Sequence, residues 1–312
     1  MVQTYTSLIG VSIQNTWLTI GSFDGLHIGH QHLIRELNDG AHQAGARSVV
    51  LSFHPHPTTV LRGRTGAFYL TTPSEKVELL DNLGTDVVIT HPFTFELSKS
   101  SASEFVLLLL KHLGFRQLWA GSDFALGKGR EGNINYLRLL GEELNYQVHV
   151  VDPISSDGRT ISSSQIRNLL LEGFVEEAKK LLGRPYQVTG EVIHGDGRGK
   201  SIGIPTANLE TGNEKLIPGA GVYACQVQLM DKLWPAAVNI GTRPTFETSH
   251  PRAHIEAHIL GFSDDLYSQQ ISIQFVSRLR GEKRFQSVEE LINQVHNDIN
   301  KTMKIFTNTN IV

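Results

Sequence analysis

Apolar residues in the first half of the chain gather in short β-branched runs that are separated by longer amphipathic segments. Five such runs predict strands, and they are Trp17 to Gly21, Ser48 to Phe53, Asp86 to Thr90, Gln117 to Gly121 and Gln147 to Val151. Strands that alternate with helices are typical of a parallel sheet with helices packed on it. Capping boxes mark two helix starts, one at Thr72 to Glu75 with Pro73 at the first helical position, and one at Ser101 to Glu104. This half therefore predicts an α/β domain.

One longer helix is predicted after the last of these strands. It begins at Ser162 to Ser164, carries apolar residues at recurring positions and runs to Gly183. Those apolar residues are Leu169, Leu170, Val175, Ala178 and Leu182. Gly183-Arg184-Pro185 then predicts a domain junction, so we expect a first domain at residues 1–183 and a second at 184–312.

Beyond the junction the apolar period changes from helical to two. Tyr223, Cys225, Val227 and Leu229 share one face of a predicted strand, and Ile255, Ala257 and Ile259 share one face of another. Several such strands between glycine and proline turns indicate a small antiparallel barrel. One helix, beginning with the capping box Ser287 to Glu290, would close the barrel with Leu291, Val295 and Ile299 facing it.

Composition agrees with two soluble domains. The 312 residues are about twice a common domain length, and a net charge of -3 gives no basic field for nucleic acid. The single cysteine, Cys225, excludes an internal disulfide framework, and the first residues lack the pattern of a secretory signal. The apolar stretch Phe105 to Leu110 is too short to cross a membrane and predicts a buried helix. We expect a cytoplasmic protein, a monomer or weak homo-oligomer, with neither nucleic acid nor membrane as partner.

The segment from Gly21 to His30 leaves the first of these strands and enters a helix, where open parallel sheets bind ligands. Gly21 and Gly25 permit a tight turn, and a helix beginning near His30 directs its positive end at the same place. An anion is the natural ligand. His27 and His30 lie three residues apart, can project the same way, and could donate hydrogen bonds to phosphoryl oxygens.

Two other interpretations of these histidines exist. An isolated pair with this spacing usually caps a helix or lies exposed. A zinc site built from His27, His30, His54 and His56 would lack both cysteine and an HExxH helix, which disfavours it.

The stretch GSFDGLHIGH resembles the HxGH nucleotidyltransferases, which share a Rossmann-like domain and transfer a nucleotidyl group from a nucleoside triphosphate. Three further segments resemble bacterial FAD synthetases: SFHPHP at Ser52 to Pro57, AGSDFALGKGREGN at Ala120 to Asn133, and ISSSQIR at Ile161 to Arg167. The resemblance implies that the first domain joins the AMP part of ATP to FMN.

The resemblance also implies roles for single residues. The ATP- and phosphate-binding residues of this domain would be Gly21, Phe23, Asp24, Gly25, Ser163, Ser164 and Arg167. Asp123 and Arg130 would lie beside the flavin. Ser164 stands where the family usually has threonine, a change that keeps the hydroxyl.

A glycine-rich segment from Gly195 to Ser201 suggests a P-loop at first sight. The opening glycine of that motif would fall at His194, and the following residues, Ile204 to Asn208, do not predict the required helix. Two interpretations remain: a surface turn of a β domain, or a flap that covers phosphates with the backbone at Gly197 and with Arg198.

The wider segment GEVIHGDGRGKSIGIPTANL resembles riboflavin kinase, as do GVYA at Gly221 to Ala224 and NIGTRPTF at Asn239 to Phe246. The resemblance implies that Thr206 and Asn208 bind the magnesium–ATP complex and that Glu256 is the general base. Arg278 and Arg280 resemble residues on the flavin side, although a charged strand end is an equal alternative.

Both halves together predict a bifunctional enzyme that converts riboflavin to FMN and FMN to FAD with two molecules of ATP and Mg²⁺. Gly261 stands where many relatives have aspartate, and Ser268 where they often have glycine, so the loop over the flavin is expected to differ. The rival hypotheses are an adenylyltransferase with a weakened kinase and a flavin-sensing binder without turnover. Intact His27, His30 and Glu256 argue against both.

Overall fold

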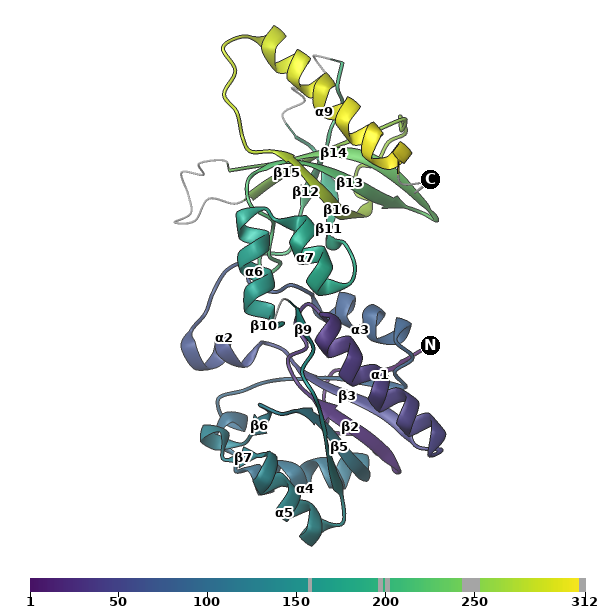
Figure 1. Ribbon diagram of the computed structural model, residues 1–312, viewed down its shortest axis with the longest axis vertical. Coiled ribbons are helices and arrows are strands. Elements are labelled where there is room, and N and C mark those ends of the chain that lie inside the picture. The colour runs from purple at the N-terminus through teal and green to yellow at the C-terminus, as the bar shows by residue number, and fades with distance from the viewer. Residues whose placement is uncertain (157–158, 196–198, 200–202, 243–252, 309–312) are drawn as a thin grey trace. The chain divides into compact units, whose positions relative to one another are not determined.

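The computed structural model describes residues 1–156, 159–195, 199, 203–242 and 253–308 (Figure 1). Its contacts divide the chain into two compact units, Met1–Ser163 and Ser164–Val312. The first unit is α/β and the second is built around a barrel, which confirms the predicted fold class.

A parallel sheet of six strands in the order β1-β4-β3-β2-β5-β8 forms the centre of the first unit. The strands are β1 (Gln3–Tyr5), β2 (Thr16–Ile20), β3 (Arg47–Phe53), β4 (Val87–His91), β5 (Phe115–Gly121) and β8 (Gln147–Val151). Five of them lie where the apolar runs predict strands. β1 was not predicted, and it extends the edge of the sheet beside β4.

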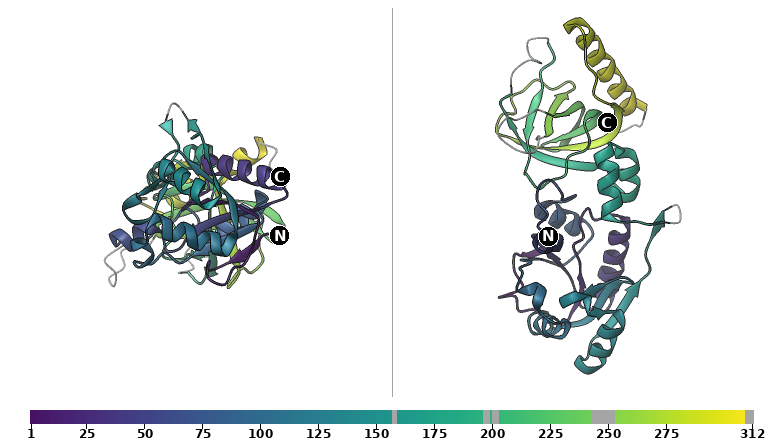
Figure 2. Two further views of the ribbon diagram at one scale, coloured as in Figure 1. Left: turned by 90° about the horizontal axis from the view of Figure 1, so that it is seen from below. Right: turned by 90° about the vertical axis from the view of Figure 1, so that its left-hand side faces the viewer.

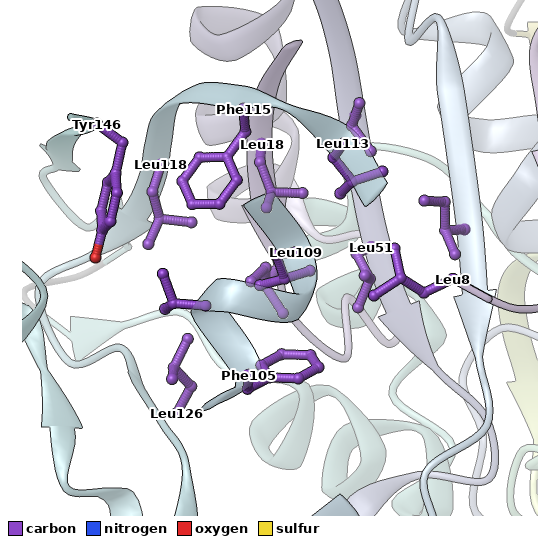
Figure 3. Close-up of a cluster of buried hydrophobic side chains, with 14 of the residues drawn as sticks. Leu8, Leu18, Leu51, Phe105, Leu109, Leu113, Phe115, Leu118, Leu126 and Tyr146 are labelled. Atoms are coloured by element: carbon purple, nitrogen blue, oxygen red, sulfur yellow. The ribbon is translucent and has the colours of Figure 1, made fainter. Parts of the chain in front are cut away.

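Helices cover both faces of this sheet because its central strands are apolar on both sides. The covering helices are α1 (Ile28–Gln43), α3 (Pro73–Asn82), α4 (Ala102–Leu113) and α5 (Ile134–Leu144), whereas the short α2 (Pro57–Arg62) has no buried residue. Val50 packs with α1 and α3 on one face, while Leu51 packs with α4 on the other. Figure 3 shows the second cluster, in which Phe105 and Leu109 lie among strand residues.

Both capping boxes predicted in this unit are formed, each with its serine or threonine and its glutamate bonded reciprocally. The helix predicted at Phe105 to Leu110 is only half covered, because Leu107 is 52% exposed. Short elements complete the unit: η1 (Leu97–Lys99), β6 (Ala125–Leu126), η2 (Lys128–Arg130), β7 (Gly132–Asn133), β9 (Ser155–Ser156) and β10 (Arg159–Thr160).

The single helix predicted up to Gly183 is wrong, because two helices occupy that segment. They are α6 (Ser163–Glu172) and α7 (Val175–Leu182). Gly173 has a φ of +83°, which no α-helix accommodates, and Arg278 and Tyr223 pack directly against it. α7 ends at Gly183 as predicted.

Six antiparallel strands form a closed barrel in the second unit, in the order β11-β12-β15-β14-β13-β16. They are β11 (Tyr186–Ile193), β12 (Ala207–Glu210), β13 (Gly221–Leu229), β14 (Lys232–Thr242), β15 (Ala253–Ile259) and β16 (Gln270–Arg280). Ile255, Ala257 and Ile259 are buried on one face of β15, as the alternation predicts. β13 is buried on both faces.

The last helix, α9 (Val288–Asn308), packs against β13, β14 and β16, and Figures 1 and 2 show it along the outside of the barrel. Its most buried positions are Asp298, Thr302 and Phe306, whereas the predicted Leu291, Val295 and Ile299 are only half-buried. At its start, Ser287 Oγ accepts from Glu290 N at 3.1 Å, but the Glu290 carboxylate accepts from Gln286 N at 3.0 Å.

Candidate active sites

The turn after β2 leads into α1 and contains the two histidines. α1 begins at Ile28, two residues before the predicted start, and His27 is its N-cap. His27 Nδ1 accepts a hydrogen bond from His30 N at 3.3 Å, so the proton of a neutral His27 ring lies on Nε2. The capping interpretation is therefore correct for His27, and the cap bond uses Nδ1 and not Nε2.

Close packing shapes the turn itself. A Cβ at Gly21 would lie 2.8 Å from the Phe23 ring, so only glycine fits there. Phe23 and Leu26 both have positive φ, at 45° and 41°, in a region that ordinary residues rarely adopt. Strained backbone of this kind persists at sites where the surrounding structure enforces it, and it supports a functional role for the turn.

His27 and His30 stack, with ring centroids 3.6 Å apart and planes inclined by 20°. The Phe23 ring meets His30 edge-on at 5.2 Å. Burial, followed by the charges of His27 and Lys76, lowers the pKa of His30 well below its ordinary value of 6.5. His30 is therefore neutral at physiological pH, and its buried Nδ1 has no hydrogen-bond partner among the described residues.

Asp24, predicted to bind ATP, has its carboxylate turned toward backbone amides. It accepts hydrogen bonds from Leu70 N at 3.0 Å and from Thr71 N at 3.1 Å, and its side chain is almost fully buried. Gly25 N in turn donates to Thr71 Oγ1 at 3.1 Å. These bonds fasten the turn to the segment before α3, so they give Asp24 a structural task in the site.

The serine-rich segment reaches the same turn through Ser163, whose Oγ donates to Asp24 O at 2.8 Å. Ser164 and Arg167 follow on α6, and Arg167 is buried. Asp123 and Arg130, predicted beside the flavin, are exposed and joined by a hydrogen bond from Arg130 Nη2 to Asp123 O at 2.7 Å. A cavity of about 370 Å³ lies in the same region, lined by Ser122, Asn133, Ile134, Asn135, Arg138 and Val150.

Sequence reasoning missed Lys76, which lies in the first turn of α3. Its side chain is 5% exposed, and its Nζ donates to Ser22 O, in the turn before His27, at 2.6 Å. Burial lowers the pKa of Lys76 from its ordinary value of 10.5 to about 8, although the nearby Asp24 raises it. A lysine near a helix start is usually solvated, so only the fold could identify it.

In the barrel, the predicted magnesium ligand and the predicted base lie on neighbouring strands. Asn208 on β12 pairs directly with Glu256 on β15, and Glu256 pairs on its other side with Asn239 on β14. Cβ atoms of directly opposed residues are about 5 Å apart, so the three side chains form one row. Asn239 was not predicted, because strand register cannot be deduced from one strand at a time.

Asn208 is the buried member of this row, and Thr206 is half-buried just before β12. The Oδ1 atom of Asn208 is buried and has no hydrogen-bond partner among the described residues. Gly195 lies against the Asn208 amide so closely that a Cβ would come within 2.1 Å of Nδ2. The predicted glycine-rich segment therefore begins on top of Asn208.

Glu256 is hydrogen-bonded to a histidine on its own strand. His254 Nε2 and Glu256 Oε1 are 2.9 Å apart, and both side chains are partly exposed. His258, on the same face, contacts Pro205 O at 2.7 Å through Nδ1. The carboxylate is thus accessible and oriented, as a general base must be.

The two arginines predicted on the flavin side make intramolecular bonds. Arg278 donates from Nη1 to Glu172 O and from Nη2 to Ala220 O, each at 2.8 Å. Arg280 donates from Nε and Nη2 to Asp298 Oδ2 at 2.9 Å, which fixes α9 to β16. These bonds favour the strand-end alternative, and the flavin-binding role of both arginines stays a prediction.

Several predicted features fall elsewhere. Gly197 and Arg198 lie outside the described residues. Gly261 and Ser268, the departures from the family pattern, both have positive φ, at 75° and 61°.

In the parts of the chain that the structure describes, no three His, Cys, Asp or Glu side chains gather as a metal site, and no helix is long and apolar enough to span a membrane.

Comparisons with known proteins agree with both predicted resemblances. An FAD synthetase family model matches residues 11–165, and a riboflavin kinase family model matches residues 182–306. Bifunctional riboflavin kinase/FMN adenylyltransferases from Bacillus subtilis and Listeria monocytogenes are 33% and 36% identical to this chain. The alignments cover 93% and 94% of this chain, and 92% and 93% of those proteins.

The Escherichia coli protein of the same name is 35% identical, over 90% of each chain. Among solved structures, a crystal structure of a macrolide-efflux protein from Streptococcus pneumoniae has a TM-score of 0.88 at 28% identity. That match covers 96% of this chain and 98% of the other, so the fold is shared across both units.

Proposed function

Because this chain belongs to the family of bifunctional riboflavin kinase/FMN adenylyltransferases, we propose that each of its two units carries one of the reactions. The chain is a transferase that phosphorylates riboflavin to FMN with ATP and adenylylates FMN to FAD. We assign adenylylation to the first predicted domain, residues 1–183, and phosphorylation to the second, residues 184–312. The helices α6 and α7, which the contacts group with the second unit, fall within the first of these domains. The observation that carries this assignment is one chemically distinct cluster in each unit, the His27–His30 stack and the Asn208–Glu256 pair.

In the first reaction site, the FMN phosphate attacks the α-phosphorus of ATP, and pyrophosphate leaves. The nucleophile is already an anion, so no general base is required, and catalysis rests on positioning and charge stabilisation. His27 presents Nε2–H as a donor, because its Nδ1 is occupied by His30 N. Gly21, Phe23, Asp24 and Gly25 form the turn. Ser163, Ser164 and Arg167 help to bind the triphosphate, and Asp123 and Arg130 lie on the flavin side.

In the second site, Glu256 takes the proton of the ribityl 5′-hydroxyl of riboflavin as that oxygen attacks the γ-phosphorus of ATP. ADP is the leaving group. A bare alcohol needs such a base, which is typically worth about 10²- to 10⁴-fold in rate. The hydrogen bond to His254 fixes the orientation of the carboxylate.

Thr206 and Asn208 would hold Mg²⁺ in this site. The residues fit the ion, since both offer the hard oxygen donors that Mg²⁺ prefers, and Asn208 Oδ1 is a buried oxygen without a protein donor among the described residues. Bound there, Mg²⁺ would neutralise negative charge on the ATP phosphates. Gly197 and Arg198 complete the proposed phosphate flap, and Arg278 and Arg280 stay assigned to the flavin side.

We further propose that the protein acts in the cytoplasm on small molecules alone, as a monomer or weak homo-oligomer. A net charge of -3 offers no field for nucleic acid, and the single cysteine suits a reducing compartment.

The function is tested by incubating the purified protein with riboflavin, ATP and Mg²⁺ and separating riboflavin, FMN and FAD by chromatography over time. FMN that appears first and FAD that follows would support both reactions. Conversion of supplied FMN without conversion of riboflavin would support the adenylyltransferase activity only. Conversion of neither compound would favour the hypothesis of a flavin-sensing binder without turnover.

Two variants test the division between the units. Glu256→Gln should keep riboflavin binding and lose FMN formation by at least about 100-fold, while FAD formation from supplied FMN continues. His30→Ala should show the reverse pattern. Equal loss of both reactions in either variant would contradict separate sites.

A further inference from the structure

The ammonium group of Lys76 is buried beneath the phosphate-binding turn of the first unit. The side chain is 5% exposed, and among the described residues its only hydrogen-bond acceptor is Ser22 O at 2.6 Å. A carbonyl oxygen satisfies one of the three N–H donors of an ammonium and none of its charge. Burying a cation in this way is unfavourable unless an anion compensates it.

The position on α3 adds to this disadvantage. Lys76 lies in the first turn, after Pro73 at the first helical position, where the helix dipole is positive and repels a cation. The first turn already holds Glu75, but its carboxylate accepts from Thr72 N in the capping box. The free protein would therefore be more stable with an apolar residue at position 76.

The charged and titratable groups that interact with Lys76 come from the turn and from α1. Asp24 attracts the ammonium, but its oxygens accept from Leu70 N and Thr71 N, and no ion pair joins it to Lys76 within the described residues. His30 on α1 is repelled by Lys76, which helps to keep its ring neutral. The ammonium thus lies behind the backbone of Ser22, attracted by the Asp24 carboxylate but without an ion pair to it among the described residues.

We propose that Lys76 is a positioning residue for adenylyl transfer: its ammonium holds the Ser22 carbonyl in place and supplies a fixed positive charge behind the turn, which is compensated when a phosphate anion binds. This proposal rests on the proposed function of the first unit. Lys76 itself touches no substrate. It acts through the turn that carries His27, and the charge also keeps His30 neutral as a hydrogen-bonding group.

The buried position of Lys76 predicts that anion binding is coupled to proton uptake. In the free protein the ammonium loses its proton at a pH of about 8, far below the ordinary value for lysine. A phosphate anion bound over the turn stabilises the charged form, so anion binding at pH 8.5 should draw a proton onto Lys76. His30 does not interfere in this range, because its pKa lies well below 6.5.

The kinetic test compares Lys76→Met, which is nearly isosteric and uncharged, with Lys76→Gln, which keeps a hydrogen-bond donor without charge. In both variants kcat/KM for FAD formation from FMN at pH 7.5 should be at least about 10-fold lower than in the wild type. This loss is smaller than the loss of about 10²- to 10³-fold in kcat that follows removal of one oxyanion-hole donor. The wild-type kcat/KM should fall above a pH of about 8, whereas the variants should show a flat profile there. Riboflavin phosphorylation by the same molecules depends on the second unit and should be unchanged, circular dichroism and urea unfolding report on the folding of the first unit, and the exposed Lys111→Met should leave both reactions at wild-type rates.

A binding test needs no turnover. The enthalpy of inorganic pyrophosphate binding is measured at pH 8.5 in buffers of different ionisation enthalpy, which gives the number of protons taken up. The wild type should take up more protons than Lys76→Met. Equal proton uptake by both proteins would overturn the proposal, and so would a wild-type rate of FAD formation by Lys76→Met. Full activity of Lys76→Gln would also overturn it, because Lys76 would then act only as a hydrogen-bond donor. A wild type that binds pyrophosphate with this uptake but forms no FAD would refute the proposed function, while the compensation of the Lys76 charge by a bound anion would stand.

Discussion

Gly195→Ala should disable the kinase site through a single added methyl group. The Cβ would lie 2.1 Å from Asn208 Nδ2, 2.4 Å from Cγ and 2.6 Å from Oδ1, where ordinary contacts begin at 3.4 Å. The Asn208 amide must therefore move by more than 1 Å. Its backbone cannot follow, because β12 is paired with β11 on one side and with β15 on the other.

A displacement of about 1 Å at a positioning group can lower a rate about 100-fold, and overpacking costs about 1–3 kcal/mol of stability. We expect kcat/KM for riboflavin phosphorylation to fall by about two orders of magnitude. FAD formation from supplied FMN should not change, since the substitution lies in the barrel. Chromatographic initial rates at several ATP and Mg²⁺ concentrations measure both quantities on one preparation.

Gly212→Ala is the matched control, because no atom lies within 4 Å of its added Cβ. A double-mutant cycle sharpens the argument: Asn208→Ala alone should be as damaging as Gly195→Ala, and the double variant should lose little more. A Gly195→Ala protein with wild-type kinase kinetics and a folded barrel would refute the reasoning, since it would show that Asn208 is not needed where the structure places it.

Three further outcomes follow from the backbone and from charge burial. Gly173→Ala should destabilise the second unit by about 1–3 kcal/mol in urea unfolding, because φ is +83° and the Cβ would lie 2.8 Å from Arg278 Cζ; Gly203→Ala, with a φ of +77° and open space, should lose less. Ser268→Gly should raise the unfolding free energy by about 0.5–1 kcal/mol, since Ser268 has a φ of 61°, and a loss of stability would contradict this account. Lys76 has its pKa lowered from 10.5 to about 8, so the unfolded chain binds more protons than the native chain between these values. The wild-type unfolding free energy should therefore rise across this window, by up to about 3 kcal/mol relative to Lys76→Met, and a constant difference between the two proteins would contradict the buried ammonium.

Elements that depend on local pattern could be predicted from the sequence. The five predicted strands were found because each contains a short apolar run, and the two capping boxes because each has its full spacing. β1 was missed, since three polar-flanked residues carry no period, and backbone pairing to β4 alone makes them a strand.

Features that depend on tertiary context could not be predicted. The apolar positions of α6 and α7 fit one helix, and only the packing of Arg278 and Tyr223 on Gly173 explains the break. For the same reason Lys76 was missed, because only the fold buries it against Ser22.

The candidate sites show the same division. His27 and His30 lie three residues apart and were found together, but their stacking and the N-cap bond require the folded turn. Asn208 and Glu256 were found by resemblance to a family, whereas their pairing and the addition of Asn239 depend on barrel register. His254 shares the polar face of β15 with Glu256, which the alternation of that strand already indicates.

Closure of the barrel also orders events on the ribosome. β16 pairs with both β11 and β13, so no barrel can close before Arg280 has been synthesised. The first unit is complete at Ser163, and at about 5–20 residues per second the 117 residues from Ser164 to Arg280 take about 6 to 23 s. During that interval a nascent chain carries a finished parallel sheet followed by unpaired strand edges, which are the surfaces most prone to wrong pairing.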